Sequence, residues 1–176
     1  MKSRKEQLLL ILAIFIFVVV SDQISKAIVR SEIQFMPNPF AGREEVFFFF
    51  THQQNPGLVN GIFQDRPYLA KIMPLFACGV LVYLYRHLDP ASRIQTIAWG
   101  LVAGGAIGNI IDRFWFGVVT DFLQVNFYFV PFEFPWKRFP AFNLADSAIC
   151  TGVFLLILSW RNVQNPTEEP RVPNPV

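Results

Sequence analysis

Four long apolar stretches, separated by polar segments, dominate the pattern of the chain. A helix needs about 20 mostly apolar residues to cross the hydrocarbon core of a bilayer. Stretches of about this length cover residues 8–29, 67–87, 93–113 and 142–160. The pattern therefore predicts an α-helical membrane protein in which residues 1–164 form one domain with four transmembrane helices.

Two longer segments, at about residues 30–66 and 114–141, join these helices on one side and are unusual for loops. Residues 46–51 are rich in phenylalanine, and residues 122–134 partly alternate aromatic with polar side chains. Such patterns are typical of short strands, and aromatic side chains favour the membrane–water interface. We therefore expect a small sheet at the surface of the membrane, with a turn at Asn55-Pro56-Gly57 after its first strand.

Lys and Arg in short flanking segments indicate the orientation of the helices. Those expected on the cytoplasmic side are Lys2, Arg4, Lys5, Arg86, Arg93 and Arg161. Both termini are therefore expected in the cytoplasm, and the Pro- and Glu-rich residues 165–176 are expected to form a disordered tail. A cleaved secretory signal is the alternative for the N-terminus, but no small-x-small site follows Val20.

Composition agrees with a membrane protein and narrows its chemistry. Only 16% of residues are charged, against about 25% in soluble domains. The net charge of +2, with no basic stripe, argues against a nucleic-acid partner. Cys78 and Cys150 lie inside apolar stretches and predict no disulfide framework. The two histidines lack the spacing of zinc ligands, so we expect neither a metal nor a cofactor.

Polar side chains gather at the ends of the last two apolar stretches. The two motifs are Asn109-x-x-Asp112-Arg113, with Asp121 just beyond it, and Asn143-x-x-Asp146. Helical residues three apart share a face, and such groups at membrane depth mark functional sites by default. Two carboxyls that lie close together share a proton, so one can activate water while the other protonates a carbonyl oxygen. The motifs therefore favour acid–base chemistry.

Two further spacings indicate how the helices are held. Gly104 and Gly108 have the small-xxx-small spacing that permits close approach of helices, and Asn109 follows directly. Asp22 and Lys26 are four residues apart in the favourable order for an ion pair within a helix. That pair either lowers the cost of two charges near the interface or orients a loop or a substrate group.

Several alternatives remain open at this point. Asp112 can form a structural ion pair with Arg113 and take no part in catalysis. Asp146 can be paired with Arg113 or Lys26, or it can be held neutral. A small proton-coupled carrier would also use buried Asp and Arg side chains, although here the polar residues cluster near one face. A non-catalytic scaffold would not explain why Asp121 and Asp146 occur in apolar surroundings.

At these residues the sequence resembles lipoprotein signal peptidase, or signal peptidase II, a family of bacterial intramembrane aspartic peptidases. The matching pieces occur in the family's order between about residues 8 and 160. They are Ser21-Asp22-Gln23-x-x-Lys26, Asn55-x-Gly57, Gly104-Gly105-x-x-Gly108-Asn109-x-x-Asp112-Arg113, Val119-Thr120-Asp121-Phe122 and Phe142-Asn143-x-Ala145-Asp146. Each piece is weak alone, but five in order are highly specific.

The resemblance implies four transmembrane helices with a periplasmic β-cradle, in the bacterial inner membrane. It implies that Asp121 and Asp146 are the catalytic dyad and that Asp22 and Lys26 are supporting residues. The residues implied to organise the site or bind substrate are Asn55, Asn109, Asp112, Arg113 and Asn143.

The resemblance also implies the partners. The substrate would be a prolipoprotein carrying diacylglycerol on its lipobox cysteine, cleaved just before that cysteine, and a globomycin-type cyclic peptide would inhibit. One position departs from the family, because Asn60 occupies a place that is usually aromatic. This departure bears on the shape of the substrate groove and not on the chemistry.

Overall fold

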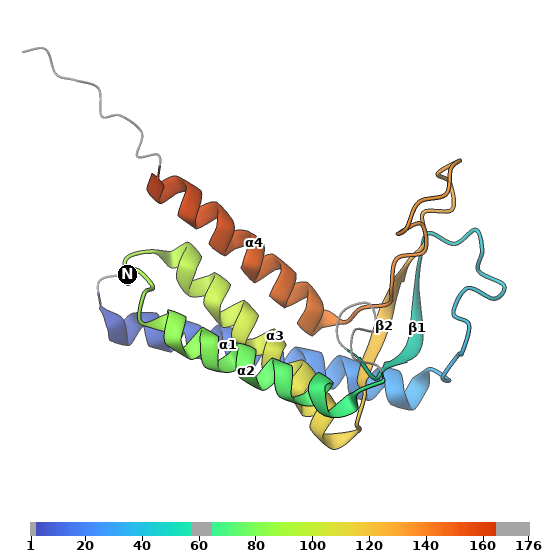
Figure 1. Ribbon diagram of the computed structural model, residues 1–176, viewed down its shortest axis with the longest axis horizontal. Helices are drawn as coiled ribbons and strands as arrows, with labels where there is room; N and C mark the ends of the chain where they lie inside the picture. Colours follow the sequence, from blue (N-terminus) through green and yellow to red (C-terminus); the bar gives the residue numbers. More distant parts are fainter. Residues whose placement is uncertain (1–2, 58–64, 165–176) are drawn as a thin grey trace, which may run out of the picture.

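Four helices and a two-stranded sheet make up the computed structural model, which describes residues 3–57 and 65–164. In chain order the elements are α1 (Arg4–Glu32), β1 (Phe48–Asn55), α2 (Pro67–Tyr85), α3 (Arg93–Trp115), β2 (Val119–Val125) and α4 (Leu144–Gln164). The helices run roughly along the long axis of the molecule, and the sheet stands across one end (Figure 1). The start of α1 and the end of α4 lie at the opposite end. The expected tail and the departure at Asn60 lie outside the described residues.

All four expected helices are present, with shifted ends. α1 begins at Arg4 because the Ser3 hydroxyl caps it, accepting a hydrogen bond from the Glu6 N–H (3.2 Å). α4 begins at Leu144, two residues later than expected. The cause is Phe142, which exchanges backbone hydrogen bonds with Leu123 of β2 (2.8 and 3.0 Å) and so belongs to the sheet end of the molecule.

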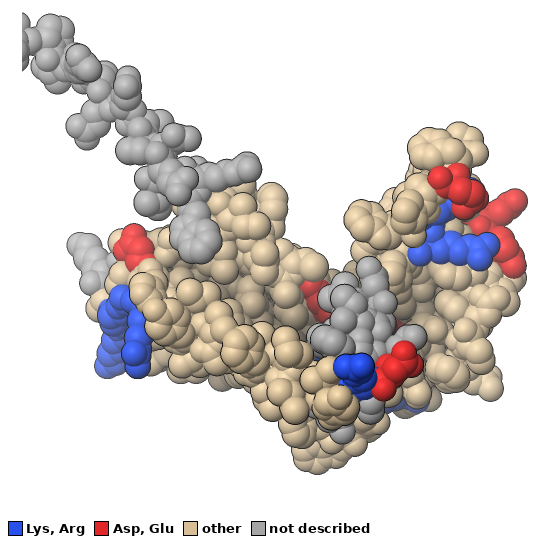
Figure 2. All heavy atoms as spheres, in the orientation of Figure 1, with Lys and Arg blue, Asp and Glu red and all other residues tan. Residues whose placement is uncertain are grey.

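Two of the helices, α1 and α3, are long and apolar enough to cross a membrane. The apolar parts of the other two are shorter, at Ile72–Tyr85 in α2 and Leu144–Ser159 in α4. On the face shown in Figure 2, charged side chains lie at both ends of the molecule and in a small group near its middle, and most of the remaining surface is uncharged, with many exposed apolar side chains along the helices. The molecule is therefore mainly helical, with a broad apolar surface around its helices.

The sheet confirms the expected strand pairing but not the expected strand limits. β1 and β2 are antiparallel, from Phe48 opposite Val125 to Asn55 opposite Val119, with an irregularity between Phe50 and Gln53. The second strand starts earlier than expected and ends at Val125. Beyond it the aromatic stretch folds back on itself, since the Phe127 N–H donates to the Lys137 carbonyl (2.7 Å).

The helices approach most closely at glycines of α3 and α4. A Cβ atom on Gly104 would lie 2.8 Å from Cβ of Val18 in α1, and one on Gly152 would lie 2.6 Å from the Ala98 carbonyl oxygen. The close approach that the glycine spacing predicts is therefore present, with α3 packed between α1 and α4. This packing brings the polar ends of the three helices together beside the sheet.

Candidate active site

The first turn of α4 is closed by a reciprocal pair of hydrogen bonds between Asn143 and Asp146. The Asp146 N–H donates to Asn143 Oδ1 (2.9 Å), and the Asn143 N–H donates to Asp146 Oδ2 (3.2 Å). This is the arrangement of a capping box, with Asn143 as the N-cap and Asp146 at the third helical position. The expectation that both residues lie within the helix on one face was therefore wrong for Asn143, which precedes it.

Two asparagine side chains connect Asp121 to Asp146. Asn143 Nδ2 donates to Asp121 Oδ1 (2.7 Å), and Asn109 Nδ2 donates to Asp146 Oδ1 (2.7 Å). The asparagines also contact each other, because Asn143 Nδ2 lies 3.2 Å from Asn109 Oδ1. A carboxyl from β2 and a carboxyl from α4 are thus held by one pair of amides.

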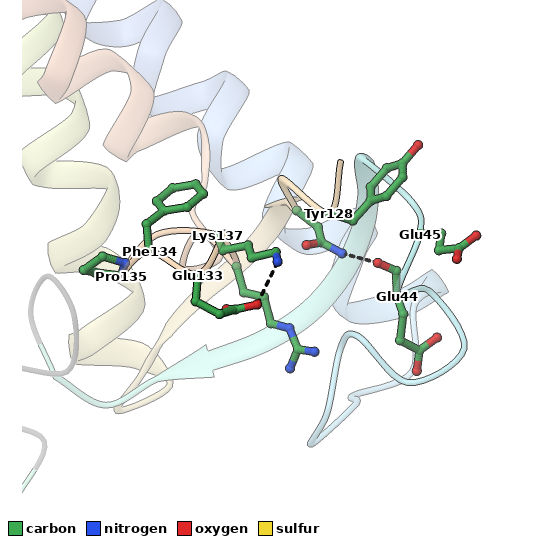
Figure 3. A pocket seen from close by; sticks show the side chains of 9 residues that line it. Glu44, Glu45, Tyr128, Glu133, Phe134, Pro135 and Lys137 are labelled. Carbon is green, nitrogen blue, oxygen red and sulfur yellow. Dashed lines mark hydrogen bonds and ion pairs between the residues drawn. The ribbon is translucent and has the colours of Figure 1, made fainter. Parts of the chain in front are cut away.

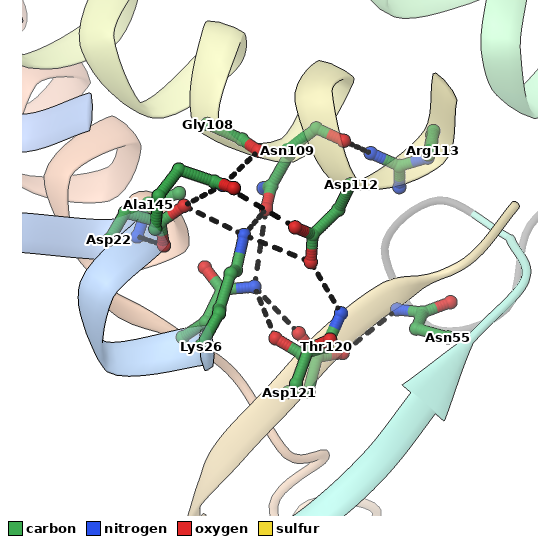
Figure 4. Close-up of polar contacts among 12 residues, drawn as sticks. Asp22, Lys26, Asn55, Gly108, Asn109, Asp112, Arg113, Thr120, Asp121 and Ala145 are labelled. Atoms are coloured by element: carbon green, nitrogen blue, oxygen red, sulfur yellow. Dashed lines mark hydrogen bonds and ion pairs between the residues drawn. The ribbon is translucent and has the colours of Figure 1, made fainter. Parts of the chain in front are cut away.

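Asp121 is buried at the start of β2 and accepts a hydrogen bond from a second direction. Asn55 Nδ2, at the end of β1, donates to Asp121 Oδ2 (3.2 Å; Figure 4). Burial, followed by the nearby charge of Asp146, raises the pKa of Asp121 to about 7, although the hydrogen bonds from Asn55 and Asn143 act in the opposite direction. Near neutral pH this carboxyl is therefore protonated far more often than an ordinary aspartate.

Arg113 connects the site to the turn after β1. Its Nη2 donates to the Gly57 carbonyl (2.7 Å), and its Nη1 donates to the Asn109 carbonyl (3.3 Å). Within the described parts of the chain, the buried Nε atom has no hydrogen-bond partner. An ion pair with Asp112 is not formed, because consecutive helical residues point in different directions. The prediction that Asp112 forms an ion pair with Arg113 was therefore wrong.

Asp112 instead faces cations of α1. Its carboxylate lies 3.5 Å from Lys26 Nζ and 3.5 Å from Arg30 Nη1, and its Oδ2 accepts the Thr120 N–H (2.9 Å). The side chain is fully buried. Asp112 therefore joins α1, α3 and the start of β2 and has no contact with Asp146 among these interactions.

The expected ion pair between Asp22 and Lys26 is present at 2.8 Å, with both side chains fully buried. Each residue also makes contact with another helix. Asp22 Oδ1 accepts the Ala145 N–H in the first turn of α4 (3.0 Å), and Lys26 Nζ donates to Asn109 Oδ1 (2.9 Å). Over residues 3–57 and 65–164 no ion pair joins Asp146 to Arg113 or Lys26. The pair thus supports the asparagines and the start of α4.

All nine residues singled out in the sequence are therefore linked in one network at the sheet end of the bundle, and Figure 4 labels all of them except Asn143 and Asp146. Three further members, Gln23, Arg30 and Thr120, had no role predicted from the sequence, although Gln23 and Thr120 lie within the matching family motifs. Gln23 Nε2 donates to the Gly108 carbonyl (3.0 Å) and lies 3.1 Å from Asp22 Oδ2. Arg30 had a signal in the sequence, because it continues the four-residue spacing of Asp22 and Lys26 along one helix face.

A separate polar hollow of about 620 Å³ lies between the segment before β1 and the segment after β2 (Figure 3). Its lining residues are Glu44, Glu45, Asn126, Tyr128, Glu133, Phe134, Pro135, Lys137 and Arg138, and none belongs to the network. In the described part of the chain, no group of three or more His, Cys, Asp or Glu side chains is arranged to hold a metal ion.

Comparisons with known proteins show which family this chain belongs to. A family model described as signal peptidase (SPase) II matches residues 14–161. The chain belongs to the signal peptidase II family. It is 36% identical over 172 residues to the lipoprotein signal peptidase of Syntrophotalea carbinolica, covering 92% of this chain and 96% of that protein. It is 38% identical over 145 residues to that of Syntrophomonas wolfei, covering 82% and 88%.

A solved structure also has the same fold as this signal peptidase II chain. It is described as a bacterial membrane enzyme determined by the in meso method, and it is 28% identical, with a TM-score of 0.69. The match covers 92% of this chain and 94% of that one. The chain is thus a membrane peptidase, which confirms the predicted enzyme class. The carrier and scaffold alternatives are set aside.

Proposed function

We propose that this peptidase removes signal peptides from lipid-modified prolipoproteins, with Asp121 and Asp146 as an aspartic dyad. Family membership supports the reaction. The observation that supports the residues is the pair of amides, Asn109 and Asn143, that holds both carboxyls at the sheet end of the bundle. The bond that breaks is the peptide bond just before the lipidated cysteine of the substrate.

The two carboxyls divide the chemistry through one shared proton. Because the pKa of Asp121 is about 7, this side chain carries the proton in much of the population near neutral pH. It donates the proton to the oxygen of the scissile carbonyl. Asp146 accepts hydrogen bonds from the Asn109 amide and the Asn143 backbone, at the positive end of the α4 dipole. Its carboxylate takes a proton from the attacking water, and no covalent intermediate forms.

Arg113 and Asn55 are proposed to contact the substrate. Both lie beside Asp121 or the turn at Gly57, so they face the place where a peptide must lie to reach the dyad. The guanidinium group of Arg113 is a planar fork of donors, which suits a substrate carbonyl oxygen. The remaining residues, Asn109, Asp112, Asn143, Asp22 and Lys26, are proposed to hold the site in place.

We further propose that all four helices span the bacterial inner membrane, with both termini in the cytoplasm. The sheet and the dyad then lie near the periplasmic face. This placement is supported by the start of α1 and the end of α4, which share the end of the molecule opposite the sheet (Figure 1). It also lets water reach the carboxyls while the acyl chains of the substrate stay in the lipid.

The reaction is tested with the purified protein, a lipid-modified prolipoprotein and the same precursor without the lipid. Mass spectrometry of the products is expected to show one cut, before the modified cysteine, in the lipid-modified precursor alone. A globomycin-type peptide is expected to block the cut, and a chelator is expected to leave it unchanged. Equal cleavage of the unmodified precursor, or a cut elsewhere, contradicts the proposed substrate.

A further inference from the structure

Arg30, in the last turn of α1, contacts the end of α3 and the start of β2 at once. Its Nη1 donates to Thr120 Oγ1 (3.0 Å) and lies 3.5 Å from Asp112 Oδ1. Its guanidinium group lies over the Phe116 ring, 4.2 Å from the ring centre. The side chain is partly exposed, with 23% of its surface accessible, in contrast to the fully buried Lys26 one turn earlier.

The segment that Arg30 contacts leads directly into Asp121. After α3 the chain reverses through Gly117, which has a positive φ of 80°, and enters β2 at Val119. Thr120 is then held in two ways: its N–H donates to Asp112 Oδ2 (2.9 Å), and its hydroxyl accepts from Arg30. Asp121 is the next residue in the chain. The contacts that hold Thr120 therefore also restrict the position of the Asp121 backbone, from which its side chain extends.

From this geometry we infer that Arg30 is a positioning residue for the dyad. It clamps Thr120 and Asp112 to α1, and through Thr120 it sets the position of Asp121 relative to Asn143 and Asp146. The inference rests on the proposed function. It assigns Arg30 no contact with the substrate.

The chemistry of an arginine suits this role. The guanidinium is a planar fork that can reach two acceptors while stacking on an aromatic ring, which a lysine ammonium cannot do with the same geometry. Lys26 does not replace it, because Lys26 contacts Asp22, Asn109 and Asp112 but makes no hydrogen bond to Thr120 within the described chain. Catalytic groups need placement to within about 0.5 Å, so loss of one clamp should reduce turnover.

The test measures kcat and KM on the lipid-modified prolipoprotein for Arg30→Met, Thr120→Val and the double variant. Each rate is taken per amount of folded, monodisperse protein. Arg30→Met is expected to lower kcat about 10- to 100-fold, with KM unchanged. Thr120→Val should act in the same direction, because it removes the hydroxyl and keeps the backbone N–H that Asp112 binds. The double variant should lose no more than the larger single loss, because both remove one interaction.

Two conservative variants and one control make the test specific. Thr120→Ser, which keeps the hydroxyl, should restore most of the activity lost in Thr120→Val. Arg30→Lys should recover only part of the loss. Arg43→Met is the matched control, since Arg43 also stacks on a phenylalanine, Phe49 (5.2 Å), but within the described chain its side chain makes no hydrogen bond or ion pair with the network. Its kcat should equal that of the wild type.

Three results would overturn the inference while leaving the proposed function standing. They are wild-type kcat in Arg30→Met, losses that multiply in the double variant, and an effect on KM alone. If Arg30→Met does not fold, Thr120→Val against Thr120→Ser decides alone, and equal rates in these two contradict the inference. Absence of cleavage by the wild type would instead contradict the proposed function itself.

Discussion

At the scale of single residues, Asn143 combines two roles that are usually separate. Its Oδ1 caps α4 by accepting the Asp146 N–H, and its Nδ2 holds Asp121 and Asn109. The first role stabilises a helix, and the second positions a proposed catalytic group. Because the side chain uses its two ends for the two roles, a substitution can separate them.

Asn143→Ser is the variant that separates these roles. A serine hydroxyl caps a helix about as well as asparagine, so the contribution of the cap to stability should change by less than about 0.5 kcal/mol. It has no amide to reach Asp121, and loss of one such donor should reduce turnover about 100-fold or more. Asn143→Ala, which lacks both groups, should be about 1 kcal/mol less stable than Asn143→Ser. Thermal unfolding and cleavage rates of both variants test this, and wild-type turnover in Asn143→Ser contradicts it.

The raised pKa of Asp121 predicts a pH-dependent stability difference. Its pKa is about 7 in the folded protein and about 4 in an unfolded chain, so the folded state binds the proton more tightly. As pH rises from about 4 to 7 the unfolded chain releases this proton first, and the wild type loses stability over that window. Asp121→Asn does not titrate. Its stability relative to the wild type should therefore rise across the window, by up to about 4 kcal/mol, and stay constant above it.

Unfolding of Asp121→Asn and the wild type at pH 5 and pH 8 measures this difference. A difference that does not depend on pH contradicts the account of Asp121 as a buried carboxyl that holds a proton near pH 7.

The residue types at the site could be predicted from the sequence, but several of their partners could not. Motif spacing and the family resemblance gave a role to nine members of the network, but not to Gln23, Arg30 or Thr120. It suggested Arg113 as the partner of Asp112, whereas the cations facing Asp112 come from α1, about 85 residues away in the chain. Helix spacing describes neighbours on one helix, and it carries no information on which face of another helix lies opposite.

At the scale of elements, the close packing of α3 on α1 and α4 depends on residues without side chains. A Cβ atom on Gly108 would lie 2.5 Å from Asp22 Oδ2 and 3.4 Å from Cβ of Ala145. The missing side chain therefore leaves the space in which Asp22 reaches the first turn of α4.

Gly108→Ala should push Asp22 away from the Ala145 N–H or separate the helices. Overpacking of this kind costs roughly 1–3 kcal/mol, and turnover should fall because the start of α4 carries Asp146. Gly79→Ala is the matched control in α2, where an added Cβ meets nothing within 4 Å. Thermal unfolding of the two variants tests this prediction. If Gly108→Ala is as stable as Gly79→Ala, the packing argument is contradicted.

The ends of a helix or strand could be predicted from the sequence where the burial of apolar side chains sets them. They could not be predicted where backbone pairing with a distant segment sets them. The helices followed from apolar length. The limits of the strands did not follow from aromatic alternation, because residues 126–138 share that composition yet fold back through Phe127 and Lys137. Likewise, α4 starts at Leu144 because Phe142 pairs with Leu123. These are long-range backbone contacts, which local composition does not encode.

At the scale of the whole molecule, the two ends differ in kind. One end carries the start of α1, the turn between α2 and α3 and the end of α4, and the other carries the sheet and the network (Figure 1). In the proposed orientation the first end faces the cytoplasm and the second faces the periplasm.

Cysteine labelling tests this orientation. In a background of Cys78→Ala and Cys150→Ala, Ala91→Cys marks the turn between α2 and α3, and Glu133→Cys marks the exposed segment after β2. A maleimide that cannot cross the inner membrane, added to cells with a permeable outer layer, should modify the second variant and not the first. The reverse pattern contradicts the proposed topology.

If Asp121 and Asp146 together perform the hydrolysis, replacing either carboxyl with an amide must stop it, and the cleavage rates of Asp121→Asn and Asp146→Asn measure this. Asp89→Asn is the control, because Asp89 also accepts a backbone hydrogen bond, from Ala91 (2.8 Å), but at the opposite end of the molecule. We predict that each dyad variant, folded and in the membrane, loses at least about 1,000-fold in kcat, while the control keeps the wild-type rate. Wild-type cleavage by either dyad variant would contradict the account.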